Sequence, residues 1–126
     1  MTLKELYLNM GGDYDQAIGV LRIEKLVDKH IRKFAKNDVA GSFFAAGESM
    51  DPVQLFETSH ALKGICANLG LKNLGGIAQT VTEEFRPGNP RKISDEEVKQ
   101  LMDSAKNLYS HITESIAEYE SAGEQK

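Results

Sequence analysis

The stretch DPVQLFETSHALKGICANLG (residues 51–70) carries the start and the end of one helix and decides the fold class. Asp51 can cap the first amides, Pro52 suits the first helical position, and Gly70 offers a left-handed stop. The residues of one helix face recur at three- and four-residue spacing: Leu55, Thr58, Leu62, Ile65, Cys66 and Leu69. The stretch therefore predicts a helix over about 52–69.

Two more helices are predicted downstream of this one. Apolar spacing predicts a shorter helix over about 74–85, and RPGNP (residues 86–90) cannot continue it. Ser94 can cap a second start, after which one apolar stripe predicts a long helix over about 95–121.

Upstream, apolar spacing predicts another amphipathic helix that ends near Asn37. Residues 38–50 fit a short helix or a turn, because Gly41 and Gly47 leave little room for a long helix. Residues 1–20 are set apart by glycines as a short N-terminal segment.

The sequence has no alternating β-branched run, so the chain is expected to be all-α. Four amphipathic helices with short connections predict an antiparallel four-helix bundle over about 20–120. Residues 1–20 are expected to cover one end, and the polar tail 121–126 is expected to fray. The chain 1–126 is predicted to be a single domain.

Composition narrows the classes of function. The 126 residues are 40% hydrophobic and 27% charged, which suits a packed core with a charged exterior. The net charge of −4 disfavours binding to nucleic acid and to anionic membranes. No run approaches the roughly 20 apolar residues of a membrane span, and the amphipathic N-terminus does not resemble a signal peptide, so a cytoplasmic location is expected.

Residues capable of chemistry lie on the predicted exposed side of the 52–69 helix. At about 100° per residue, His60, Lys63 and Gly64 fall opposite the apolar face. A glycine within an exposed helix costs roughly 1 kcal/mol relative to alanine. Close approach of another backbone would explain its presence beside a histidine.

This pattern resembles the histidine phosphotransfer (HPt) family of two-component phosphorelays. The family motif has leucine or phenylalanine two residues after its histidine, then lysine at +3, glycine at +4 and glycine at +10. The matching residues are His60, Leu62, Lys63, Gly64 and Gly70. The resemblance covers about residues 20–120 and includes the helix order and Gln79 on the following helix. The chain departs from the family at Ile65 and Cys66, where members often carry serine or alanine, a difference that concerns core packing.

The resemblance implies a phosphorelay function. His60 is then the phosphorylated residue, which accepts the phosphoryl group from a receiver aspartate or a kinase and passes it to another receiver. Lys63 offsets the phosphoryl charge, Gly64 admits the receiver, and Gln79 positions the imidazole ring or the phosphoryl oxygens. The expected partners are response-regulator receiver domains and a sensor or hybrid histidine kinase.

The same resemblance implies that the receiver supplies Mg²⁺, so this chain needs no cofactor or metal of its own. A monomer is expected, with neither nucleic acid nor membrane as a partner. The sequence has no glycine-rich phosphate loop and no nucleotide-binding pattern, so we expect no kinase or ATPase activity.

Two other classes of protein compete with this hypothesis. A plain helical adaptor would bind partners without exchanging phosphate. A di-iron bundle would use Glu-x-x-His motifs, and Glu57 with His60 forms one such motif, but neither His30 nor His111 supplies a second. His30 is followed at +4 by Phe34 instead of glycine, which makes it a structural residue, and His111 is expected at the surface of the last helix.

The remaining expectations concern the surface around His60. Part of an apolar strip formed by Val53, Phe56, Ala67 and Leu71 is expected to form a docking patch, unless Phe56 is buried under residues 1–20. Arg86 either is a solvated charge or contacts an acidic rim of the receiver. Cys66 is expected to be a small buried hydrophobe without redox chemistry.

Overall fold

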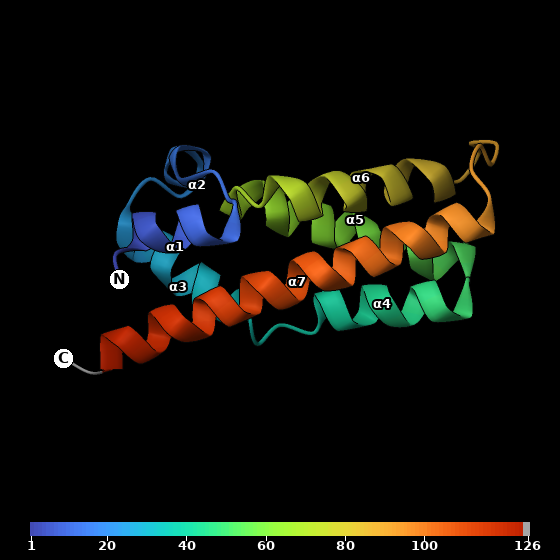
Figure 1. Cartoon of the computed structure of the whole chain (residues 1–126). Coiled ribbons are helices and arrows are strands. Elements are labelled where there is room, and N and C mark those ends of the chain that lie inside the picture. The colour runs from blue at the N-terminus through green and yellow to red at the C-terminus, as the bar shows by residue number, and fades with distance from the viewer. Residues whose placement is uncertain (125–126) are drawn as a thin grey trace.

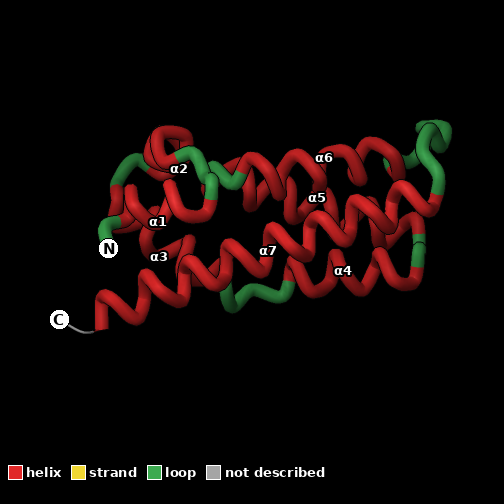
Figure 2. The backbone as a smooth tube through the Cα atoms, viewed as in Figure 1, coloured by secondary structure: helices red, strands yellow, loops and turns green. Residues whose placement is uncertain are grey.

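The computed structural model describes residues 1–124, and this range is helical without any strand. Seven helices joined by short connections make up the described chain (Figures 1 and 2). They are α1 (Leu3–Met10), α2 (Tyr14–Leu21), α3 (Glu24–Phe34), α4 (Val39–Ser49), α5 (Pro52–Leu69), α6 (Lys72–Phe85) and α7 (Asp95–Glu124). The all-α prediction is confirmed.

Helix α5 has the bounds that its sequence predicts. Asp51 Oδ1 accepts hydrogen bonds from the amides of Val53 (3.0 Å) and Gln54 (3.3 Å) and so caps the N-terminus. Gly70 ends the helix at φ 68°, and its carbonyl accepts a hydrogen bond of 2.7 Å from the amide of Asp13. A Cβ at Gly70 would collide with the carbonyl oxygen of Asp13. This glycine therefore stops α5 and also admits the start of α2.

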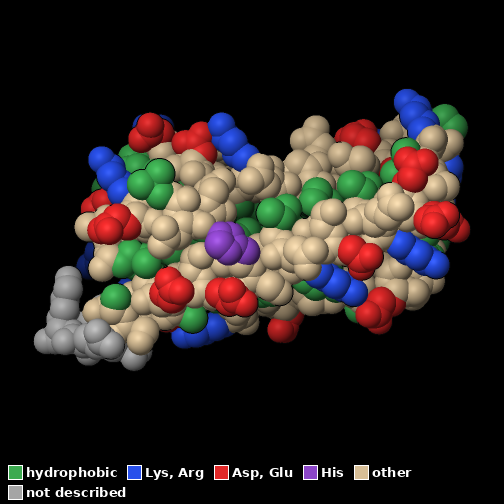
Figure 3. Space-filling view, viewed as in Figure 1, with side chains coloured by type: hydrophobic (Ala, Val, Ile, Leu, Met, Phe, Trp, Pro, Cys, Tyr) green, Lys and Arg blue, Asp and Glu red, His purple; other side chains and the backbone are tan. Residues whose placement is uncertain are grey.

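Helix α5 lies at the centre of the packing, between α4 and α6. Helix α7 runs along the molecule and contacts α1, α3, α4 and α6 (Figure 1). Gly75 allows α6 to come close to α5, because a Cβ at this position would lie 3.0 Å from Cys66 Cβ. Figure 3 shows hydrophobic side chains in the seam between α6 and α7, with acidic and basic side chains spread over the rest of this face.

In the segment between α3 and α5, the structure has the helix and not the turn of the two predicted alternatives, and it differs from the expectation in where α3 ends. Helix α3 ends at Phe34 instead of near Asn37, and residues 39–49 form a regular helix of 11 residues. Asn37 Oδ1 accepts a hydrogen bond of 2.7 Å from the amide of Val39 at the start of α4. Gly47 packs against the Met102 side chain of α7, so this glycine serves close helix packing instead of breaking the helix.

The N-terminal residues form α1 and α2, which lie with α3 at one end of the molecule (Figure 1). Tyr7 on α1 donates a hydrogen bond of 2.8 Å to the carbonyl of Leu69 at the end of α5. Helix α2 packs against α5 and α3, and Asp13 caps it through the amide of Gln16. The predicted break between residues 1–10 and the following helix is confirmed at Gly11, which has φ 69°.

Helix α7 is longer than its sequence predicts. It begins at Asp95 as expected, but it continues to Glu124, three residues beyond the predicted end. Of the tail 121–126 that was expected to fray, residues 121–124 are helical, and residues 125–126 lie outside the described range.

Candidate functional site

His60 is exposed on α5, and the residue before it explains why the helix presents it to solvent. Ser59 is fully buried, and its hydroxyl accepts a hydrogen bond of 2.9 Å from Thr82 Oγ1 on α6. Ser59 also donates a hydrogen bond of 3.1 Å to the carbonyl of Phe56. Because this buried pair joins α5 to α6 immediately beside His60, it fixes the rotation of α5 and turns the imidazole away from the core. Nothing in the sequence pattern marks this pair.

Phe56 lies one turn before His60 and contacts its ring. The two ring centroids are 5.8 Å apart with planes inclined by 19°, and the Arg86 guanidinium lies 5.4 Å from the Phe56 centroid. Phe56 is half-buried at this site. Of the two alternatives for Phe56, the structure places it in the surface around His60. Its spacing of four residues from the histidine was the signal available in the sequence.

A charged group lies next to this aromatic stack. Arg86 donates hydrogen bonds of 2.8 and 3.2 Å to the carboxylate of Glu83, near the end of α6. Arg86 lowers the pKa of Glu83, and Lys63 on α5 contributes further to this lowering. The amino group of Lys63 therefore lies within electrostatic reach of α6, on the same side of α5 as His60.

Gly64 is open to solvent on the strip that carries His60. Apart from the backbone of its own helix, no heavy atom of the described chain lies within 4 Å of an ideal Cβ built at this position. Gly75 on α6, whose Cβ would meet Cys66, is the contrasting case. Packing in this chain therefore does not require glycine at position 64.

The structure places Lys63 and Gln79 together in one shallow groove between α5 and α6. Gly75 and Gly76 form part of the same groove, and Gln79 is exposed there. His60 is not among the residues that line this groove, so the structure brings Gln79 together with Lys63 and not with His60 in one groove. The role assigned to Gln79 stays a prediction.

The prediction that Leu71 belongs to an exposed docking patch is wrong. Leu71 is buried, with 2% of its surface exposed, because it follows the left-handed Gly70 and turns back into the core before α6. Val53 is 64% exposed and Ala67 is exposed, as expected for a surface strip. Val53, Phe56 and Ala67 are therefore the members of the predicted strip that keep exposed or partly exposed surface.

The other two histidines have different surroundings. His30 is exposed on α3, and Phe34 at +4 is buried. His111 Nε2 donates a hydrogen bond of 2.6 Å to the carbonyl of Asn9 and so joins α7 to α1. His111 is exposed on α7, as predicted, and this hydrogen bond gives it a structural contact in addition.

Cys66 is buried with 1% of its surface exposed, and burial raises the pKa of its thiol to about 12. It is a small buried hydrophobe, as predicted. Among the residues that the structure describes, no group of three or more histidine, cysteine or carboxylate side chains is placed to hold a metal ion. None of the helices in residues 1–124 has the length and apolar character needed to cross a membrane.

No protein-family model, curated protein or solved structure matches this chain.

Proposed function

We propose that this chain is a histidine phosphotransfer protein that accepts a phosphoryl group on His60 and passes it to a receiver domain. The observation that carries the proposal is the strip of His60, Lys63 and Gly64 on α5, in which the histidine and the glycine are exposed and the lysine is partly exposed, with open space above the glycine. This arrangement combines a nucleophile, a cation and clearance for a second backbone on one helix face.

The scaffold proposed for this function is an antiparallel four-helix bundle over about residues 20–120, with α1 and α2 as the N-terminal cover. Five helices, α3–α7, lie in this range, and α4, α5, α6 and α7 are proposed to form the bundle. Packing of α5 on α4 and α6, and of α7 on α4 and α6, supports this arrangement. The bundle holds the reactive helix rigidly, which suits a reaction that depends on alignment.

In the proposed step, the lone pair of His60 Nε2 attacks the phosphorus of a receiver aspartyl phosphate. An N–P bond forms, the P–O bond to the aspartate breaks, and the aspartate leaves as a carboxylate while the imidazole releases the proton on Nδ1. Lys63 offsets the charge of the transferring group, since phosphoryl transfer depends mainly on positioning and charge neutralisation. Gln79 is proposed to hold the phosphoryl oxygens or the ring by a hydrogen bond.

The docking face is proposed to consist of the apolar surface around His60, with Phe56 next to the histidine and the exposed Val53 two turns before it on the same helix face. The receiver supplies Mg²⁺ and the aspartate, and a sensor or hybrid histidine kinase is the proposed source of phosphate. In this proposal the chain acts in the cytoplasm as a monomer without kinase or ATPase activity of its own.

The test is incubation with a receiver domain that carries a radiolabelled aspartyl phosphate. We expect wild-type protein to gain acid-labile label and His60→Gln to gain none while keeping its fold, because an exposed side chain contributes little to packing. His30→Gln and His111→Gln are matched controls that should be labelled like wild type. Labelling of the His60 variant, or stable receiver binding without any label on wild type, would refute the proposal and favour an adaptor.

A further inference from the structure

The charges of this chain are segregated along its sequence. Residues 22–36 hold six basic and two acidic side chains, a net charge of +4, whereas the whole chain has a net charge of −4. The remaining residues therefore hold nine basic and seventeen acidic side chains. Helix α3 lies within this basic segment.

Most of the basic side chains of this segment are not engaged in ion pairs. Arg32 pairs with Asp28 at 3.1 Å and with Glu120 at 3.5 Å, and Lys36 lies 3.9 Å from the same glutamate. Within residues 1–124 the other four basic side chains form no ion pair: Arg22, Lys25, Lys29 and Lys33. Such a surface attracts anionic partners.

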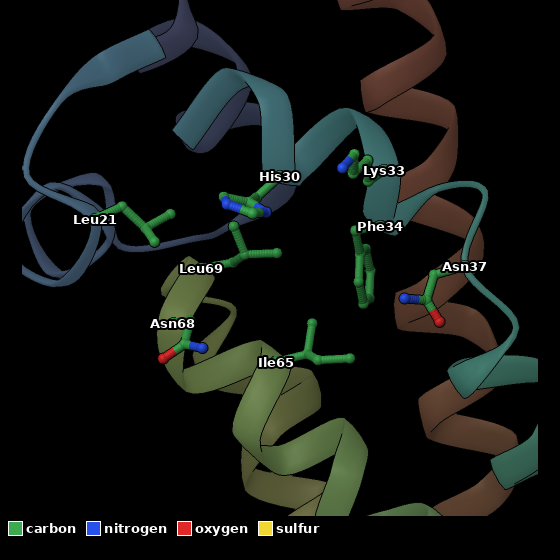
Figure 4. Close-up of a pocket in the computed structure, with 8 residues that line it drawn as sticks. All are labelled: Leu21, His30, Lys33, Phe34, Asn37, Ile65, Asn68 and Leu69. Carbon is green, nitrogen blue, oxygen red and sulfur yellow. The ribbon is translucent and has the colours of Figure 1, made fainter. Parts of the chain in front are cut away.

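A cavity of about 220 Å³ opens beside these cations, between α3 and the end of α5. Its apolar walls come from three helices, and Figure 4 shows the side chains converging from them. The apolar members are Leu21, Phe34, Ile65 and Leu69. A cavity of this size suits one large apolar side chain and is too small for a helix.

The polar members of the cavity lining are all able to donate hydrogen bonds. They are His30, Lys33, Asn37 and Asn68, and no carboxylate lines the cavity. Asn37 uses its oxygen to accept from the Val39 amide, which leaves its NH₂ group as a donor. An apolar floor below a cationic, donor-rich rim matches a ligand that combines an apolar group with carboxylates.

Exposed apolar side chains continue this surface away from the cavity. Val20, Ile23 and Leu26 are 47%, 53% and 37% exposed. Leu26 lies four residues before His30 and seven before Lys33, so the three residues share one strip of α3. This strip of α3 therefore carries apolar and basic side chains and ends at the cavity, which His30 and Lys33 line.

We infer that this surface binds an acidic polypeptide segment, with one aromatic or leucine side chain in the cavity and flanking carboxylates on Lys33 and the other donors that line the cavity. The large apolar side chain supplies the anchor, and the charges select the partner and speed its approach. The cavity uses Ile65 and Leu69 of α5, which lie on a different face from His60 and Gly64. This inference does not depend on the proposed phosphotransfer function.

The test is a titration of ¹⁵N-labelled protein followed by two-dimensional NMR. The probe is the peptide acetyl-Asp-Glu-Phe-Asp-Glu-amide, with one control peptide that has alanine in place of phenylalanine and a second that has lysine in place of every acid. We expect saturable shifts of the amides of Leu21, His30 and Asn68. The alanine peptide should bind at least about fivefold more weakly, since it lacks the anchor. The lysine peptide should cause no shift.

Two charge reversals on α3 distinguish binding of the peptide in the cavity from general electrostatic attraction of the peptide to the basic segment. Lys33→Glu places a carboxylate on the rim of the cavity and should lower the affinity for the phenylalanine peptide by about tenfold or more. Lys29→Glu makes the same change on the same helix at a residue that does not line the cavity, and it should weaken binding by less than about threefold. Both lysines are exposed, so unfolding curves should match wild type.

Three results would overturn the inference. They are absence of saturable shifts around the cavity, equal affinity of the phenylalanine and alanine peptides, and equal effects of the two lysine variants. A further experiment uses vesicles that contain anionic phospholipid. Co-sedimentation of the protein with these vesicles, together with no peptide binding, would assign the surface to a membrane instead.

Discussion

Replacement of Gly64 should make the protein more stable and less active. The position lies within α5 and a Cβ there meets no neighbour, so alanine gains helix propensity without a steric penalty. The expected gain is up to about 1 kcal/mol. An unfolding entropy of about 2.1 cal/mol/K per residue amounts to about 0.26 kcal/mol/K for 126 residues. The midpoint of thermal unfolding should therefore rise by up to about 4 °C.

Glutamine at the same position tests function. It keeps most of the gain in helix propensity, but its side chain occupies the space above α5 that the receiver must enter. Thermal unfolding and the single-turnover rate of transfer from a phosphorylated receiver should be measured on the same samples. We expect Gly64→Gln to unfold at or above the wild-type midpoint and to accept phosphate at least about tenfold more slowly.

Two matched variants control this experiment. Gly75→Ala adds the same methyl group to a helix, but its Cβ would lie 3.0 Å from Cys66 Cβ. This variant should therefore not show the rise in stability expected of Gly64→Ala. Gly41→Gln changes an open glycine of α4 and should leave transfer unchanged. A midpoint of thermal unfolding that is lower for Gly64→Ala than for wild type would refute the open geometry at this position. Transfer by Gly64→Gln at the wild-type rate would refute the steric role of Gly64.

Three further predictions use other residues. Lys63→Ala should slow single-turnover transfer by about tenfold while receiver affinity, measured by calorimetry, stays within about twofold; loss of affinity at an unchanged rate would contradict its role. Gly70→Ala should lower the free energy of unfolding in urea by about 2–4 kcal/mol, since the left-handed backbone and the Asp13 carbonyl both oppose a side chain; a smaller loss would show that α2 shifts freely. Burial raises the pKa of Cys66 from 9.0 to about 12, so above pH 9 the unfolded chain releases this proton while the folded chain keeps it. Relative to Cys66→Ala, wild type should therefore lose stability between pH 9 and pH 11, and a thiol reagent should label it only after unfolding.

The ends of α5 could be predicted because the signals are local. Asp51 with Pro52 and the left-handed Gly70 act on neighbouring residues, and the structure has both caps. The same holds for the exposure of His60, which follows from its angle to the apolar face.

Features that depend on tertiary contacts were beyond the sequence. Helix α4 forms although it contains two glycines, because Gly47 packs on Met102, and this contact joins residues far apart in the chain. Helical periodicity placed Leu71 at the surface, but the chain leaves the helix before it. The Ser59 and Thr82 pair was missed because small hydroxyl residues at a helix contact give no distinctive pattern.

The loop before α7 shows another unpredicted arrangement. Glu84 is buried and accepts hydrogen bonds from the amides of Lys92 and Ile93 and from Arg91 at 2.7 Å. Burial raises the pKa of Glu84, but these hydrogen bonds outweigh it and leave the pKa lowered overall. Nothing in the sequence marks this arrangement, since Arg91 and the amides of Lys92 and Ile93 come to Glu84 from the loop that follows its helix.

The length of α7 and its contacts with segments far away in the sequence affect how this chain folds. Its 30 residues extend for about 45 Å. The bond between Asn9 and His111 joins residues 102 positions apart, and the bond from Tyr119 to Asp28 joins residues 91 positions apart. Helix α5 gives α2, α3, α4 and α6 a packing surface as soon as it is made, but the contacts of α1, α3, α4 and α6 with α7 form only after residues 95–124 have been synthesised. Folding should accordingly be slower than in a helical protein whose neighbours in space are neighbours in sequence.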